Sequence, residues 1–72
     1  MDFYISIYKD NNHLDLQVTE TLNEAVSVCN SSVGNHFKIH PDGQDHYLVG
    51  DKQDNGHIDW MKNELIGIER LK

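Results

Sequence analysis

Cysteine, proline and long apolar runs are nearly absent from this chain of 72 residues. Its one cysteine, Cys29, cannot form a disulfide within the chain. The sequence also shows no signal peptide and no apolar run of membrane-spanning length. Because disulfides persist mainly in oxidising compartments, an unpaired cysteine without a targeting segment predicts a soluble protein of the cytoplasm.

Basic side chains are scarce as well. Six Lys and Arg residues stand against twelve Asp and Glu residues, which gives a net charge of −6. Affinity for phosphate backbones and for anionic membrane surfaces comes from Lys and Arg, so we expect direct binding to neither nucleic acid nor membrane. An acidic chain suits a protein partner with a basic surface.

Catalytic motifs are also missing. No serine lies in a nucleophile elbow, and no glycine has the spacing of a phosphate-binding loop. We therefore expect one small domain over residues 1–72 that has no cofactor and is not an enzyme. A chain of this size buries roughly 60% of the surface that it exposes when unfolded, so its core must be modest.

Residues 21–34 carry the strongest helical signal. Thr21 and Glu24 have the spacing of a capping box, in which each side chain binds the backbone N–H of the other residue. Apolar residues then recur on one helical face, at Leu22, Ala25, Val26, Cys29 and Val33. Gly34 would end the helix in the left-handed conformation. A helix of about three turns with one apolar face is marginal alone, so we expect it to pack on a sheet.

Two alternating segments, residues 3–8 and 13–19, come before the helix and favour strands. The residues between them, KDNN, favour a turn. The apolar positions that we expect to face inward are Phe3, Ile5, Ile7, Leu14, Leu16 and Val18. The pattern predicts a hairpin whose apolar face receives the helix.

Three more strands are predicted after the helix, over residues 36–40, 46–51 and 57–61. The turn signals between them are Pro41-Asp42-Gly43 and Asn55-Gly56. Residues 64–72 fit either a short helix or a further strand, and Ile-Gly-Ile favours the strand. The predicted fold class is α+β, with a single helix packed on an antiparallel sheet in the order ββαβββ and a sixth C-terminal strand as an option.

Three of the five histidines cluster in sequence, at His36, His40 and His46. On an extended strand about 13 Å separates His36 from His40, which is too far for one metal ion. His40 and His46 could instead meet at a hairpin end, with Asp42 or Asp45 as a third ligand. We treat His40 and His46 as weak metal candidates, and a metal enzyme built on them as the remote alternative. Exposed strand histidines are the favoured interpretation.

Acidic residues gather in two segments that hold few bases. Residues 10–24 contain four acids and no Lys or Arg, and residues 42–59 contain five acids against Lys52. On the folded chain the two segments could merge into one negative surface that steers a basic partner. The candidate binding residues are the acids Asp42, Asp45, Asp51 and Asp54, with Tyr8 as an aromatic anchor.

Tyr4 and Tyr8 alternate with Ile5 and Ile7, so they occupy the opposite face of the first strand. Tyrosine is enriched at interface hot spots, which favours a partly apolar binding patch. The alternative is that the helix covers the tyrosine face, and that Phe3 and the isoleucines face a dimer or the C-terminal segment. Alternation alone leaves both open.

The run VTETLNEAV resembles the strand-to-helix junction of HicB-type antitoxins and of small phage inhibitors of bacterial RNA polymerase. The HicB pattern also has a glycine-rich second strand and a C-terminal DNA-binding segment, which this sequence lacks. Capping produces the same junction in many α+β domains, so we assign no family from it.

Size, charge and the lack of catalytic motifs together predict a small acidic module that binds another protein. Within that class we expect an inhibitor of a nucleic-acid-handling protein, of the type encoded by phages and mobile elements, that mimics nucleic acid. The alternatives are an antitoxin-like partner of a basic toxin and a homodimeric structural domain.

Overall fold

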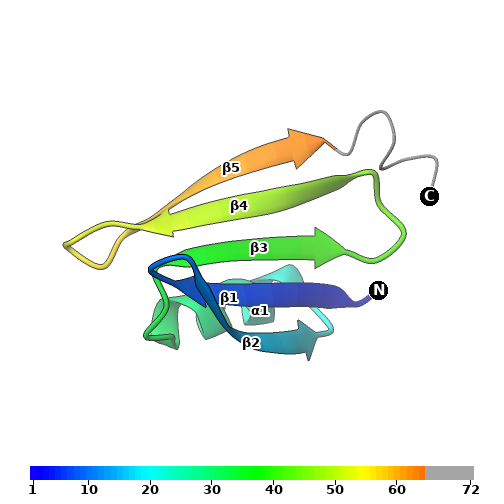
Figure 1. Cartoon of the computed structure of the whole chain (residues 1–72). Coiled ribbons are helices and arrows are strands. Elements are labelled where there is room, and N and C mark those ends of the chain that lie inside the picture. The colour runs from blue at the N-terminus through cyan, green and yellow to red at the C-terminus, as the bar shows by residue number, and fades with distance from the viewer. Residues whose placement is uncertain (65–72) are drawn as a thin grey trace.

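The computed structural model of this chain describes residues 1–64. One helix lies against a five-stranded antiparallel sheet (Figure 1). The strands are β1 (Phe3–Lys9), β2 (Asn12–Thr19), β3 (His36–Pro41), β4 (His46–Lys52) and β5 (Ile58–Glu64), and the helix is α1 (Leu22–Ser31). The predicted α+β class, with one helix on an antiparallel sheet, is confirmed.

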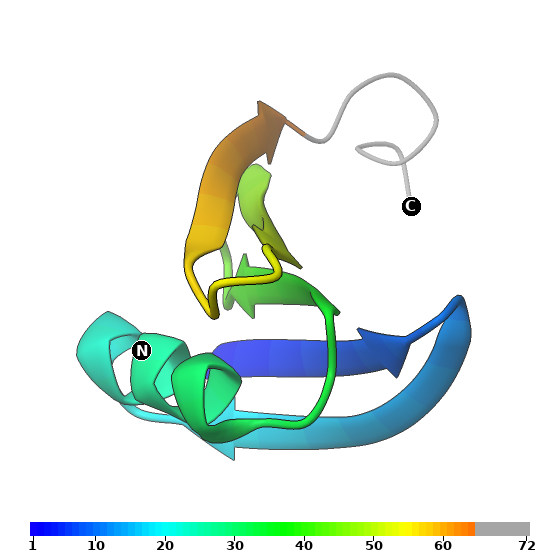
Figure 2. The same cartoon turned by 90° about the vertical axis from the view of Figure 1, so that its left-hand side faces the viewer.

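The order of the strands across the sheet is β2-β1-β3-β4-β5, which differs from their order along the chain. β1 lies between β2 and β3 and pairs with both. Alternation in a sequence defines the faces of a strand but not its neighbours, so this order was not predictable from the pattern. β5 is the C-terminal strand of the described residues, and the sixth strand predicted beyond it lies outside them. Figure 2 shows the twist that turns β4 and β5 steeply across β1 and β2.

The helix begins where the sequence predicts and ends earlier. The Thr21 hydroxyl accepts the Glu24 backbone N–H at 3.1 Å, and the Glu24 carboxylate accepts the Thr21 N–H at 3.1 Å. The capping box is therefore confirmed. The last helical residue is Ser31, and the C-cap residue Ser32 is extended, with φ −82° and ψ 152°. The prediction that Gly34 ends the helix is wrong.

Gly34 has a packing role instead. A Cβ atom at this position would lie 2.6 Å from Ile7 Cγ2 and 2.8 Å from the Tyr8 carbonyl oxygen. The chain that returns from the helix therefore passes so close to β1 that only glycine fits. Val33, predicted in the buried stripe, lies beyond the helix and is 78% exposed.

The core lies between α1 and the sheet face that it covers. Its buried members are Ile5, Ile7, Ala25, Cys29, Phe37, Ile39 and Ile58. The predicted inward face of β1 is therefore confirmed, with Ile5 and Ile7 buried and Phe3 partly buried. The helix C-terminus is closed by Lys52, whose Nζ donates to the Ser32 carbonyl oxygen at 2.6 Å. A cation at this end of a helix is favourable because the last carbonyl groups carry partial negative charge.

Cys29 sits in this core with no exposed surface. Burial raises the pKa of its thiol to about 11, and the nearby positive charge of Lys52 offsets only part of that increase. Because the thiolate is the nucleophilic form, Cys29 is an unreactive core residue at neutral pH.

The turn between β1 and β2 sets their register. Asp10 and Asn11 both have positive φ, of 50° and 69°, and Lys9 pairs with Asn12 across the turn. If this register continued unchanged, Leu14 would lie opposite Ile7 and every apolar residue of β2 would face the helix. The register instead shifts between Ile7 and Tyr8.

The shift is a β-bulge in which Leu14 is the extra residue. Beyond it, Ile7 pairs with Asp15, and the residues that follow keep this new register. A slip of one residue moves every later side chain to the other face of a strand. Leu16 and Val18 therefore point away from the helix and are 59% and 54% exposed. The prediction that Leu16 and Val18 face the core is wrong, and Leu14, which was also predicted to face it, is 48% exposed at the bulge and lies outside the core.

Candidate functional site

The sheet face opposite α1, which we call the open face, carries three cross-strand rows of side chains. Paired residues of antiparallel strands point to the same side, so the strand pairing defines each row. From β2 to β5, the first row is Val18, Tyr4, His40, Tyr47 and Asn63. The second row is Leu16, Ser6, Lys38, Val49 and Met61. The third row is His13, Tyr8, His36, Asp51 and Asp59.

Large apolar side chains stand exposed in the first two rows. Leu16 and Val18 are more than half exposed, Met61 is 67% exposed and Tyr4 is 38% exposed. Apolar groups that lie together in water favour contact with another surface, at about 25 cal/mol for each Å² that becomes buried. Sequence alternation missed two of these residues, because the bulge that moves Leu16 and Val18 leaves no sequence signal.

Tyr8 is the centre of the aromatic contacts in the third row. Its ring meets the rings of His13 and His36 edge to face, with centroid distances of 5.2 and 5.7 Å. The ammonium group of Lys38 lies 5.7 Å from the Tyr8 ring centroid, a cation–π distance. Tyr8 points away from the core, as the alternation of β1 predicts, and its neighbours hold it in place.

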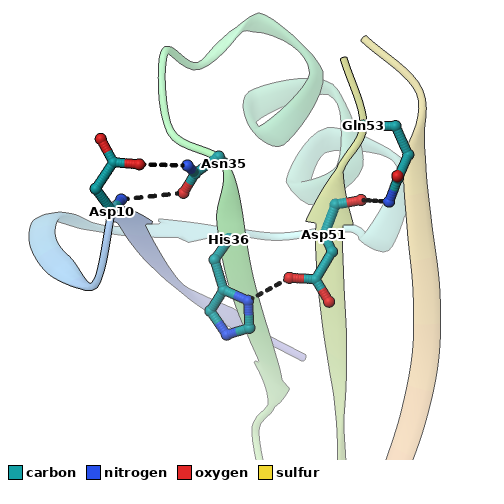
Figure 3. Close-up of polar contacts among 5 residues, drawn as sticks. All are labelled: Asp10, Asn35, His36, Asp51 and Gln53. Carbon is teal, nitrogen blue, oxygen red and sulfur yellow. Dashed lines mark hydrogen bonds and ion pairs between the residues drawn. The ribbon is translucent and has the colours of Figure 1, made fainter. Parts of the chain in front are cut away.

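Polar contacts fasten the ends of the strands around His36, as Figure 3 shows. His36 Nδ1 lies 2.6 Å from Asp51 Oδ1, which joins β3 to β4. Asn35 Nδ2 donates to Asp10 Oδ1 at 3.0 Å, and the Asp10 backbone N–H donates to Asn35 Oδ1 at 3.2 Å. Gln53 Nε2 donates to the Asp51 carbonyl oxygen at 3.3 Å. These contacts fix the β1–β2 turn and the ends of the central strands.

A hollow of about 220 Å³ opens beside His36 and is lined by Tyr8, Asn11, His36 and Lys38. Lys38 brings a positive charge to it, and the other three side chains bring hydrogen-bonding groups. A histidine oriented by a carboxylate resembles the arrangement of a general base, but the His36 and Asp51 side chains are 35% and 62% exposed. At that exposure water competes for both groups, and Lys38 is the one formally charged side chain that lines the hollow.

The four predicted acids lie at two opposite ends of the sheet. Asp42 and Asp45 belong to the β3–β4 loop, whereas Asp51 ends β4 and Asp54 lies in the β4–β5 turn. These two ends appear on the right and the left of Figure 1. A strand of seven residues separates them by roughly 20 Å. The single merged surface expected from the sequence is therefore replaced by two acidic ends that flank the open face.

His40 and His46, the weak metal candidates, point to opposite faces of the sheet. His40 stacks on Tyr47 on the open face, with ring centroids 4.8 Å apart and an interplanar angle of 12°. His46 precedes Tyr47 in β4, so alternation turns it to the other side, where its Nδ1 lies 3.7 Å from Asp45 Oδ1. Within residues 1–64, no three His, Cys, Asp or Glu side chains are grouped as a metal site would require.

Comparison with known proteins identifies no relative of the chain. No protein-family model, curated protein or solved structure matches it. The described part of the chain contains no helix that is long and apolar enough to cross a membrane. The functional proposal therefore rests on the geometry and the charge of the chain itself.

Proposed function

We propose that this chain is a non-enzymatic protein-binding module whose partner packs on the open face. The observation that carries the proposal is the exposure of Leu16, Val18 and Met61 on a sheet face that no described element covers. Tyr8 supplies a positioned aromatic ring beside them. Aromatic anchors surrounded by apolar contacts are the usual centre of a protein–protein interface.

The open face is about as large as one side of a standard interface. Five strands, each about 4.8 Å wide and seven residues long at about 3.3 Å per residue, cover roughly 24 by 23 Å. This projection is roughly 550 Å², and the relief of the side chains brings the accessible area closer to the ~800 Å² that each partner buries in a stable complex.

The charge of the chain defines the partner further. With a net charge of −6 and acids at both ends of the open face, the complementary surface is apolar in the middle and basic at its rim. Proteins that handle nucleic acid present basic surfaces, so we favour an inhibitor of such a protein. An antitoxin-like partner of a basic toxin has the same chemistry. A homodimer would bring two charges of −6 together, which opposes it at low salt.

The test is affinity capture from a cell lysate with three forms of the full chain: wild type, Met61→Asp and Leu22→Asp. Met61 is 67% exposed on the open face, whereas Leu22 is 39% exposed in the first turn of α1, where an acid is favourable. Both variants add one negative charge, so they differ only in position. We expect wild type and Leu22→Asp to capture the same proteins and Met61→Asp to lose them.

The dependence of capture on ionic strength distinguishes the charged contacts from the apolar contact. If basic groups of the partner meet the acidic ends, raising the ionic strength weakens capture, while the apolar contact persists. Equal capture by all three forms would refute binding through the open face. Loss with Leu22→Asp alone would move the interface to the helix.

A further inference from the structure

A groove of about 510 Å³ lies between β2 and the C-terminal half of α1. Its apolar walls include Leu14 from the sheet and Val28 and Val33 from the helix and the turn after it. Leu14 is 48% exposed and Val33 is 78% exposed, so the walls are open to solvent. Leu14 is the extra residue of the bulge and lines this side of the sheet together with Asp15.

Among the strands of residues 1–64, β2 is a free edge of the sheet beside this groove. It pairs with β1 on one side only, and each of its residues except Thr19 is exposed. The outer N–H and C=O groups of an edge strand can pair with an extended segment of another chain. The side chains of such a segment alternate, so every second one would point toward the groove.

Asp15 determines the charge that we expect on a segment bound at this edge. It is the one charged residue that lines the groove. Its Oδ1 accepts the Leu16 backbone N–H at 2.9 Å, and its Oδ2 accepts Gln17 Nε2 at 3.0 Å. The ion pairs found within residues 1–64 all involve other acids. An inward charge on an edge strand blocks indiscriminate pairing, and a cation on the incoming strand would remove that block.

We infer that a partner adds an extended basic segment to β2, with a Lys or Arg beside Asp15 and an apolar side chain in the groove between β2 and α1. The net charge of −6 favours the same basic segment. This inference rests on the proposed function for the class of partner, but it uses the edge of the sheet and not the open face.

The probe is a capped peptide of eight residues with threonine at every second position and valine and arginine in turn at the positions between, so that valine and arginine share the face that points toward the groove. It is titrated into the full chain while backbone amide signals and their hydrogen exchange are followed by NMR. We expect signal changes at residues 14–19 and at Val28 and Val33, together with slower exchange of the β2 amides. Asp15→Asn should weaken binding about threefold. Asp59→Asn, which removes the same charge from the other edge strand, should leave the affinity within about 1.5-fold of wild type.

Two control peptides separate strand pairing from unspecific charge attraction. One carries proline at alternate positions, which removes N–H donors, and one carries glutamate in place of arginine; we expect neither to bind. Equal binding of the proline peptide, or signal changes confined to β5 or the open face, would overturn the inference. Slower exchange of β2 amides at high protein concentration without peptide would overturn it too, because a second copy would then occupy the edge. Met61→Asp should bind the peptide as wild type does, so this inference and the open-face proposal fail independently.

Discussion

Replacing Leu16 by alanine tests the sheet face on which the functional proposal depends. Leu16 is 59% exposed, so roughly two fifths of its side chain is buried. Complete burial of a leucine is worth about 1.5–3 kcal/mol, and alanine keeps a small part of that, so we expect a loss of about 1 kcal/mol. A Leu16 that faced the helix, as plain alternation predicts, would lose about 3–5 kcal/mol on truncation.

The assay is equilibrium urea unfolding followed by the fluorescence of Trp60, the single tryptophan. Trp60 packs near Phe37 in the core, with ring centroids 6.4 Å apart, so its signal reports loss of the core. Ile7→Ala is the comparison, because Ile7 is 2% exposed and its truncation should cost about 2–5 kcal/mol. A domain of this length has about 4–11 kcal/mol of stability, and Ile7→Val serves if Ile7→Ala does not fold.

Similar losses for Leu16→Ala and Ile7→Ala, at about 3 kcal/mol or more, would refute the bulged register. Leu16 and Val18 would then belong to the core, and the open face would lose two of its most exposed apolar residues. The proposal that a partner packs on the open face would then be wrong as well.

Three further predictions concern the core. Gly50→Ala should cost about 1–3 kcal/mol and change the Trp60 fluorescence, because a Cβ there would lie 2.6 Å from Trp60 Cζ3; an unchanged unfolding midpoint would contradict the packing. Because the folded-state pKa of Cys29 is raised from 9.0 to about 11, the free energy of unfolding should fall as pH rises from about 9 to 11. The fall should be less steep in Cys29→Ala, and parallel pH profiles of the two proteins would refute the burial of the thiol. Lys52→Met should lower the free energy of unfolding in urea by about 1 kcal/mol, because the hydrogen bond to the Ser32 carbonyl oxygen is lost. An unchanged free energy of unfolding would mean that this hydrogen bond does not stabilise the end of the helix.

Features that depend on neighbouring residues were predictable from the sequence. The capping box of Thr21 and Glu24 forms as its spacing indicates. Gly43 and Gly56 have positive φ, of 74° and 89°, as the turn signals around them require. In each case the deciding interaction spans only a few residues.

Features that depend on long-range geometry were not predictable. The bulge at Leu14 reverses the faces of β2, although the alternation of that strand is clean. Gly34 matches a helix stop in sequence, yet its close approach to Ile7 explains its presence. Asp42 and Asp51 are near in sequence but lie at opposite ends of the sheet, because β4 runs between them. The places of these residues in the fold depend on strand order and register, and a local sequence pattern predicts neither.

The most direct test of the open-face proposal is methyl cross-saturation NMR on the complex with the captured protein. Saturation passes from the partner only to methyl groups at the interface. We expect the signals of Leu16, Val18 and Met61, all exposed on the open face, to lose intensity, while those of Leu22 and Ala25 in α1 do not. Loss of intensity at the α1 methyl groups with the open-face signals unchanged would contradict the proposal.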